Sequence, residues 1–241
     1  MSNNLYNNHI LINLHKKKKL SSEIVTQMLY GEKFKLIKRF GKWWRIKLHN
    51  DNYEGFIIKK KFKKKINHRY KINCLKANIY KLPSTKKLTN KKLSFASRIS
   101  PLNKSGSFIE FERNKWIKIS DTKPINYKTK NIFEKLKIFK GTKYRWGGKN
   151  YNGVDCSAII QLCFNFNNKY FPRDSKDQLK YLKKNIDIKK IKKNDLIFWK
   201  GHVAIAISKK YLIHAYAPYK KVVKMKINKT IEIIKNKSNL K

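Results

Sequence analysis

Residues 147–161 read Gly-Gly-Lys-Asn-Tyr-Asn-Gly-Val-Asp-Cys-Ser-Ala-Ile-Ile-Gln, a glycine-rich loop followed by an apolar segment. The segment stays almost wholly apolar through Phe166, which predicts a central, buried helix that begins at Cys156. Backbone N–H groups in the first turn of a helix are unpaired and carry partial positive charge. We therefore expect the pKa of the Cys156 thiol to be lowered, which would make this residue a nucleophile near neutral pH.

Two later histidines can complete a catalytic group. A thiol nucleophile needs an imidazole to take its proton, and that imidazole works best when a third polar group fixes its tautomer. His202 directly precedes one predicted strand and His214 lies in the middle of the next. Each residue also has an ordinary explanation, because buried cysteines and lone strand histidines are common in protein cores. Their placement on three separate elements that can converge favours catalysis.

The spacing of the histidines restricts the hairpin between them. They are twelve residues apart, and side chains along a strand alternate between faces with a period of two. A regular two-residue turn at Lys209 and Lys210 would put the two rings on opposite faces. We therefore expect pairing centred on Ser208 or on Lys209, or a bulge that restores the phase. Pairing centred on Lys209 would make the histidines diagonal neighbours.

The N-terminal half of the chain predicts two small β domains. Short alternating runs separated by turn residues occur between residues 13 and 62 and again between residues 67 and 126, where the first expected strand is at residues 72–75. The segment around Trp116 echoes the one around Trp43, which suits two similar barrels. A lysine cluster at residues 59–65 marks the boundary. We expect two barrels at residues 1–65 and 66–126, and a third domain at residues 127–241.

The periodicity changes after Pro124. Thr129 is a candidate cap for a helix that ends at Gly141 and has one apolar face, made of Ile132, Phe133, Leu136 and Phe139. A capping box at Ser175 predicts a further amphipathic helix. Four strands follow, at residues 195–199, 203–207, 211–216 and 222–227. Helices followed by hairpin-linked strands predict an α+β domain with an antiparallel sheet.

The composition bounds the possible partners. The chain has 60 Lys+Arg against 14 Asp+Glu, a formal net charge of +46, with 41% hydrophobic residues. The excess is mostly lysine, runs from end to end and accompanies abundant Asn and Ile, as an A/T-rich coding sequence would produce. We therefore do not expect nucleic acid as a partner on charge alone. The alternative is a catalytically inactive basic protein that binds nucleic acid or another acidic polymer.

Targeting and cysteine usage point to the same compartment. The apolar run near the amino end is too short for a secretory signal, and no stretch of about 18 apolar residues is present. We expect a cytoplasmic protein that does not associate with membranes. Cys74, Cys156 and Cys163 form no disulfide framework, and their spacing does not fit zinc. We expect neither a metal nor a cofactor.

A series of blocks, in order, resembles the NlpC family of bacterial cysteine peptidases. The blocks are Tyr144-Arg145-Trp146-Gly147-Gly148, Gly153-Val154-Asp155-Cys156-Ser157-Ala158, Pro172-Arg173-Asp174-Ser175, Asn194-Asp195-Leu196-Ile197-Phe198, His202-Val203 and His214-Ala215. The resemblance covers about residues 127–227. The two N-terminal units resemble the bacterial SH3-like barrels that often accompany this domain. Ala158 and Asn194 depart from the family pattern, which has glycine at both positions.

The resemblance implies a papain-like peptidase domain and a role for each site residue. Cys156 is then the nucleophile, His202 the general base and His214 the residue that orients it. Tyr144 would lie beside the oxyanion and the substrate, while Asp155 and Ser157 would border the pocket for the free amino end of the peptide.

The implied reaction is hydrolysis of the amide bond between γ-D-glutamate and an L-linked diamino acid in peptides derived from peptidoglycan. A cytoplasmic member would act on imported wall peptides that have a free N-terminal L-Ala. A barrel packed over the catalytic groove would exclude longer chains. Transacylation by the same thiol is a further possibility.

Overall fold

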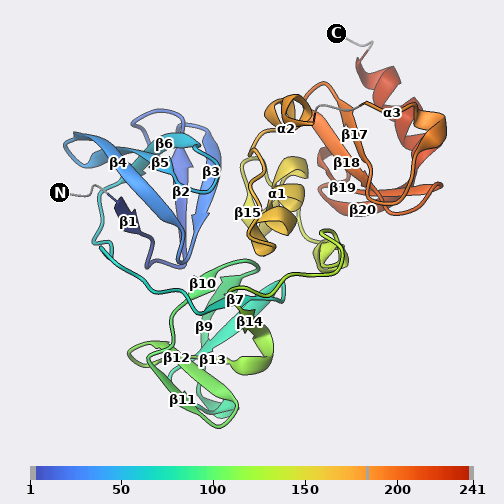
Figure 1. Cartoon of the computed structure of the whole chain (residues 1–241). Coiled ribbons are helices and arrows are strands. Elements are labelled where there is room, and N and C mark those ends of the chain that lie inside the picture. Colours follow the sequence, from blue (N-terminus) through green and yellow to red (C-terminus); the bar gives the residue numbers. More distant parts are fainter. Residues whose placement is uncertain (1–3, 183–184, 239–241) are drawn as a thin grey trace.

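The computed structural model describes residues 4–182 and 185–238. Two β domains, formed by the first and second parts of the chain, lie against a C-terminal domain (Figure 1). In that domain helix α1 (Cys156–Phe166) lies between the first β domain and a four-stranded sheet. The predicted α+β architecture is confirmed.

The first β domain is a six-stranded antiparallel sheet in the order β1-β4-β5-β6-β2-β3. Its strands are β1 (Asn4–Tyr6), β2 (Leu11–His15), β3 (Ile24–Leu29), β4 (Lys33–Phe40), β5 (Trp43–Leu48) and β6 (Glu54–Ile58). The period-2 pattern of the sequence buries Phe34, Ile46 and Ile57 completely in its core. The sheet therefore packs its apolar face inward, as the alternation predicted.

The second β domain contains two sheets, of three and five strands, in the orders β10-β7-β14 and β11-β12-β13-β8-β9. The strands are β7 (Tyr70–Ile72), β8 (Lys76–Tyr80), β9 (Leu88–Ser94), β10 (Arg98–Ile99), β11 (Asn103–Ser105), β12 (Phe108–Glu112), β13 (Lys115–Lys118) and β14 (Thr122–Pro124). Short 3₁₀ turns are η1 (Thr85–Lys87) and η2 (Ile119–Asp121). The expected strand at residues 72–75 is wrong, because β7 ends at Ile72 and Cys74 lies in the connection to β8.

The C-terminal domain continues from the short 3₁₀ helix η3 (Leu136–Phe139) and the ribbon β15 (Lys149–Asn150) and β16 (Gly153–Val154) into α1 and α2 (Ser175–Tyr181). Its sheet has the order β17-β18-β19-β20, from β17 (Leu196–Trp199), β18 (His202–Ala206), β19 (Tyr211–Tyr216) and β20 (Lys221–Lys226). The remaining elements are η4 (Ile188–Lys190), η5 (Ala217–Tyr219) and α3 (Ile227–Ser238). All four predicted strands are confirmed within a residue or so.

The predicted helix after Thr129 is wrong. Thr129 does not cap a helix, because its N–H and hydroxyl donate to the side chain of Asn167, and the hydroxyl also contacts the Asn131 carbonyl. The Asn131 side chain accepts from the N–H of Phe133 and so favours a local turn. The apolar residues are still buried, but over turns and the four residues of η3.

Two helices also differ from expectation. The second helix begins at Ser175 itself, with Asp174 at the N-cap position and without a side-chain cap hydrogen bond. Helix α3 had no counterpart in the sequence analysis, because its segment is mostly polar.

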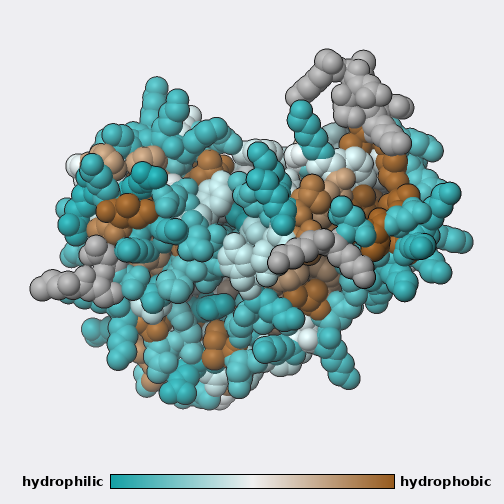
Figure 2. Space-filling model, turned by 45° about the horizontal axis from the view of Figure 1, so that its top comes forward, coloured by the Kyte–Doolittle hydropathy of each residue, from teal (hydrophilic) through white to brown (hydrophobic). Residues whose placement is uncertain are grey.

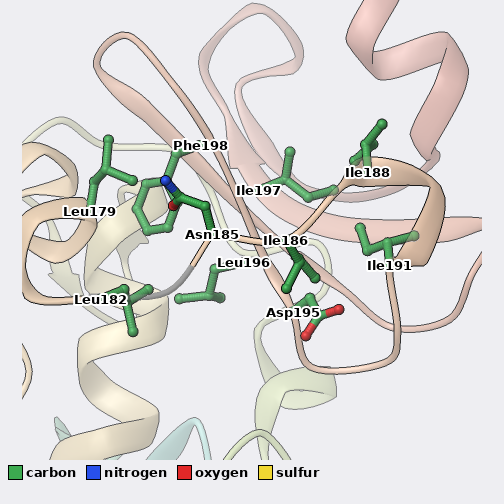
Figure 3. Close-up of a pocket in the computed structure, with 10 residues that line it drawn as sticks. All are labelled: Leu179, Leu182, Asn185, Ile186, Ile188, Ile191, Asp195, Leu196, Ile197 and Phe198. Atoms are coloured by element: carbon green, nitrogen blue, oxygen red, sulfur yellow. The ribbon is translucent and has the colours of Figure 1, made fainter.

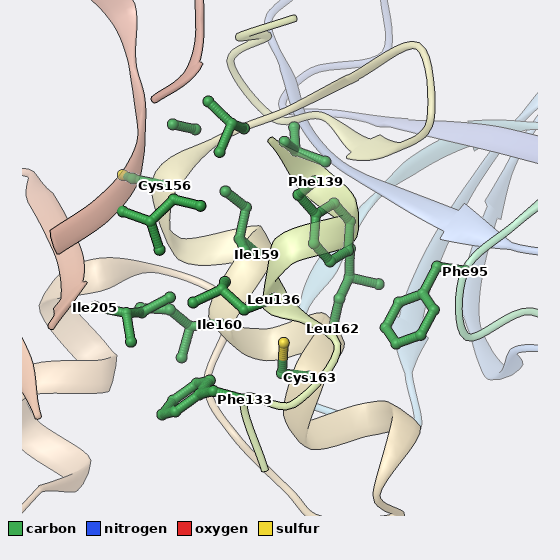
Figure 4. Close-up of a cluster of buried hydrophobic side chains, with 14 of the residues drawn as sticks. Phe95, Phe133, Leu136, Phe139, Cys156, Ile159, Ile160, Leu162, Cys163 and Ile205 are labelled. Carbon is green, nitrogen blue, oxygen red and sulfur yellow. The ribbon is translucent and has the colours of Figure 1, made fainter. Parts of the chain in front are cut away.

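One apolar core joins all three domains. Leu29 comes from the first β domain, and Phe95 and Ala96 come from the second. The third domain supplies the other members: Phe133, Leu136, Phe139, Val154, Cys156, Ile159, Ile160, Leu162, Cys163, Phe166, Phe171, Val203, Ile205, Ile213, Ala215 and Val222. In Figure 4, Cys163 lies inside this cluster and Cys156 lies at its margin. Helix α1 is therefore held by side chains from both β domains and from the sheet.

The second β domain also holds the far end of α1. The ammonium group of Lys71, a fully buried side chain, donates to the carbonyl of Phe166 and lies 4.7 Å from the centroid of its ring. Arg98 donates to the carbonyl of Asn165. A cation at the C-terminal end of a helix compensates the partial negative charge of the unpaired carbonyls.

Hydrophilic side chains cover most of the face shown in Figure 2, with small separate apolar patches between them. Among the described residues, no helix is long and apolar enough to cross a membrane.

Candidate active site

The first turn of α1 is fixed by Asp155. This residue is the N-cap, and its Oδ1 accepts from the N–H of Ala158 at 2.8 Å. Its Oδ2 accepts from the N–H of Gly147 at 3.0 Å, which ties the glycine-rich loop to the helix start. Cys156 is the first helical residue, as predicted, and its side chain is buried.

Arg173 completes the pairing of the Asp155 carboxylate. Its guanidinium donates to both carboxylate oxygens, at 2.9 and 2.6 Å, and to the hydroxyl of Ser157 at 2.9 Å. Its Nε donates to Thr26 of the first β domain at 2.7 Å. A bidentate arginine–carboxylate pair is directional and strong, so this group fixes the helix start against the first β domain.

The two predicted histidines lie together. Pairs Ile205–Ile213 and Ala206–Leu212 show that the hairpin pairing centres on Lys209, one of the two registers predicted. His202 and His214 are therefore diagonal neighbours on one face, and their Nε2 and Nδ1 atoms are 2.8 Å apart. The prediction that both rings share one face is confirmed.

Cys156 lies beside the start of the same strand. The backbone N–H of Val203, the residue after His202, hydrogen-bonds to its sulfur. Within the described part of the chain, the two rings hydrogen-bond to each other and His214 also contacts the sulfur of Met225, but no hydrogen bond joins either ring to the thiol. The structure thus brings the histidines together and places the thiol next to their strand.

Burial decides the charge state of these groups. Burial raises the pKa of the Cys156 thiol to about 12, and the Asp155 carboxylate adds to this increase. The N–H of Val203 and the guanidinium of Arg173 lower the pKa of the thiol, but by less than burial raises it. The prediction of a lowered thiol pKa from the helix start alone is therefore wrong. Burial also lowers the pKa of His202 to about 4. Near neutral pH the thiol and the imidazole are both uncharged.

Tyr144 lies close to the same group. Burial raises the pKa of its phenol, and the neighbouring Cys156 and Asp155 raise it further. The phenol therefore stays protonated and can donate a hydrogen bond. Its backbone is fixed by a bridge to Val154 and by a hydrogen bond from its N–H to the carbonyl of Lys220.

A pocket of about 310 Å³ opens at Cys156. Asp155 and Ser157 line it, as the sequence analysis expected. Side chains of the first β domain line the other side, and nothing in the sequence pattern had predicted them as site residues. The first-domain residues are Lys16, Glu23, Val25 and Tyr53, and the third domain adds Trp146, Asp174, Ser175 and Lys176.

Two carboxylates in this pocket come from different domains. Glu23 accepts from the indole N–H of Trp146 at 2.7 Å and from Lys16 at 3.0 Å, and these hydrogen bonds lower its pKa. Asp174 accepts from the Tyr53 hydroxyl at 3.1 Å. Asp174 belongs to a block that the sequence analysis had noted, whereas nothing local in the sequence marks Glu23 or Tyr53.

The glycine-rich loop touches the first β domain so closely that a side chain cannot fit. Gly147 has φ +67°, and a Cβ there would lie 2.0 Å from the carbonyl oxygen of Ile24 in β3. The backbone therefore approaches the barrel at a distance that only glycine permits.

A second cavity, of about 280 Å³, lies between α2 and β17 (Figure 3). Its lining is mainly apolar and includes Leu179, Leu196 and Phe198, but neither Cys156 nor the histidines. Cys74 and Cys163 are free thiols, and burial raises the pKa of each to about 12. Within residues 4–182 and 185–238, no group of three or more His, Cys, Asp or Glu side chains could hold a metal ion.

Comparison with known proteins agrees with this geometry. Residues 141–235 match the NlpC/P60 family, and residues 14–61 match the bacterial dipeptidyl-peptidase SH3 domain. The chain is therefore a cysteine peptidase that carries an NlpC/P60 domain behind an SH3-like domain.

The similarity extends over most of the chain. It is 26% identical over 232 residues to dipeptidyl-peptidase 6 of Lysinibacillus sphaericus, covering 86% of this chain and 85% of that protein. It is 22% identical over 232 residues to γ-D-glutamyl-L-lysine dipeptidyl-peptidase of Bacillus cereus, covering 81% of this chain and 68% of that protein. A crystal structure of an NlpC/P60 family protein from Bacillus cereus has the same fold, with a TM-score of 0.80 and 18% identity over 93% of this chain and 94% of that one.

Proposed function

We propose that this peptidase hydrolyses the amide bond between γ-D-glutamate and an L-linked diamino acid in peptidoglycan-derived peptides with a free N-terminal L-Ala. The observation that carries the proposal is the pocket at Cys156, which the first β domain closes on one side. The names of the two dipeptidyl-peptidase relatives support it. A pocket bounded in this way suits a short amino-terminal segment, and the first β domain would block a longer chain.

The free amine would be recognised by the carboxylates that face the pocket. Asp155 is a poor candidate, because Arg173, Ser157 and two backbone N–H groups already donate to its oxygens. Glu23 and Asp174 line the same pocket and have fewer partners. We assign recognition of the ammonium group to these two carboxylates, and the support of the helix start to Asp155.

The proposed reaction starts from a neutral pair. The Cys156 sulfur attacks the carbonyl carbon while its proton passes to His202, so that the two charges form only as the reaction proceeds. Backbone N–H at the helix start and the Tyr144 hydroxyl donate to the developing oxyanion. Protonated His202 then gives its proton to the leaving amine, and water hydrolyses the thioester. The ring must approach the thiol when substrate binds, since such hydrogen bonds often tighten only in the complex.

We further propose that the enzyme acts in the cytoplasm, in the recycling of wall peptides.

Incubation with L-Ala-γ-D-Glu-diaminopimelate and mass analysis of the products tests the reaction. The expected products are L-Ala-γ-D-Glu and the free diamino acid, and they should be absent with Cys156→Ala. Cleavage at another bond, or no thiol-dependent cleavage, would contradict the proposed substrate.

A further inference from the structure

The outer nitrogen of His214 has an unusual partner. Its Nε2 lies 3.2 Å from the sulfur of Met225 in β20, while its Nδ1 lies 2.8 Å from His202. His214 pairs with Val223, so Met225 is its diagonal neighbour on β20 just as His202 is on β18. His202, His214 and Met225 therefore form one row across three adjacent strands.

The chemistry of this row fixes its protons. A thioether sulfur can accept a hydrogen bond but cannot donate one. A neutral imidazole has one donor and one acceptor nitrogen, so the His214 Nε2 that meets Met225 carries the proton and its Nδ1 accepts. The Nε2 of His202 must then be the donor. The Nδ1 of His202 is left with its lone pair, which is the form that a general base requires.

The surroundings hold the ring in this orientation. His214 is 1% exposed, and the ring of Tyr216 stacks on it with centroids 4.7 Å apart and planes 9° apart. Burial lowers the pKa of His214 to about 3, with a further contribution from His202, so the ring stays neutral near pH 7. Only a neutral imidazole has one donor nitrogen and one acceptor nitrogen, so the positions of the two protons in this row are fixed.

We propose that Met225 is a positioning residue, whose sulfur selects the tautomer of His214 and thereby leaves Nδ1 of His202 free to act as the base. The inference rests on the proposed role of His202, but the tautomer itself can be measured without any turnover.

The direct test is the ¹⁵N spectrum of the wild-type protein with labelled histidine near pH 7. We expect His214 to carry its proton on Nε2 and His202 to carry its proton on Nε2. A proton on Nδ1 of His214 would overturn the proposal, whether or not the tripeptide is cleaved.

A variant tests the consequence. Met225→Leu keeps a similar side-chain volume but removes the hydrogen-bond acceptor, so His214 should populate both tautomers. As expected for the loss of one weak hydrogen bond, kcat should fall by about three- to tenfold, while KM should stay unchanged. Met28→Leu, in the buried core of the first β domain, is the matched control and should keep the wild-type kcat and spectrum. An unchanged kcat or an unchanged tautomer of His214 in Met225→Leu would overturn the proposal. If that variant does not fold, the tautomer of His214 in the wild-type spectrum tests the proposal alone.

Discussion

At the scale of single residues, the position of Cys156 at a helix start was predictable, but its protonation state was not. The unpaired N–H groups favour a thiolate, whereas burial of the side chain disfavours any charge, and burial prevails here. The sequence shows the helix start but cannot show how completely the folded chain covers the thiol. The resting enzyme therefore holds a thiol beside a neutral imidazole.

The nucleophile can be distinguished from the second cysteine of the same helix. Cys156→Ala should abolish hydrolysis and leave the fold intact, because the sulfur lies at the margin of the core, beside the pocket. Cys163→Ala should keep the activity and lower the free energy of unfolding by about 1 kcal/mol, since Cys163 is fully buried. Turnover of the tripeptide and chemical denaturation measure the two effects. Loss of activity in Cys163→Ala alone would reverse the assignment.

The buried histidines predict a stability loss in acid. Their pKa values are lowered from 6.5 to about 4 in His202 and about 3 in His214, so the unfolded state binds more protons than the folded state below pH 6.5. The free energy of unfolding should therefore fall as the pH falls from 6.5 through 4. His202→Gln with His214→Gln should flatten that decline, whereas His49→Gln, at an exposed position, should keep it. Denaturation midpoints of the wild type and the variants, measured between pH 6.5 and pH 4, test this prediction.

At the scale of elements, the hairpin between the two histidines was predicted correctly from the sequence pattern, whereas the helix predicted after Thr129 does not form. The phase of the hairpin follows from chemistry, because both histidines must face one site, and the observed register agrees. The segment after Thr129 has the apolar spacing of a helix, but Asn167 and Asn131 offer side-chain hydrogen bonds that compete with helical ones. Asn167 is distant in sequence, so its influence could not be predicted locally.

The hairpin register makes its own prediction. Deletion of Lys209 should move the centre of the hairpin pairing from a residue to a point between two residues. The two histidines would then lie on opposite faces of the sheet, and kcat should fall by about 10³-fold, as expected for loss of general base catalysis. Insertion of two glycines after Lys209 keeps the phase and should retain most of the activity. Equal activity of the deletion and the insertion would show that the diagonal contact is not required.

At the scale of the whole molecule, the pocket depends on how the first β domain docks. Lys149, fully buried, pairs with Glu32 of that domain at 2.7 Å, and Gln161 of α1 donates to Asp51 at 2.8 Å. These contacts bring Glu23 and Tyr53 to the pocket. Sequence reasoning predicted a barrel over the groove but not its residues, because docking joins positions more than a hundred residues apart.

The close approach at Gly147 tests this docking. Gly147→Ala should place a Cβ against the Ile24 carbonyl, displace the domain and lower kcat/KM by about 10²-fold, the cost of misplacing a binding group by roughly 1 Å. Gly41→Ala is the matched control, because Gly41 also has a positive φ, +55°, but nothing lies within 4 Å of its Cβ position. It should cost about 1 kcal/mol of stability and leave kcat/KM unchanged. Equal kcat/KM losses would show that backbone strain, not docking, is responsible.

The most direct measurement is the ratio of kcat/KM for L-Ala-γ-D-Glu-diaminopimelate to that for the same peptide acetylated on its L-Ala nitrogen. If the carboxylates of the pocket recognise a free ammonium group, the wild-type ratio should be about 10² or more, as loss of a charge-assisted hydrogen bond implies. Glu23→Gln should lower the ratio about tenfold, while Glu54→Gln, which changes an exposed pair with Arg45 outside the pocket, should leave it unchanged. A wild-type ratio near one would contradict recognition of the free ammonium group and would indicate an endopeptidase that does not recognise the amino end of its substrate.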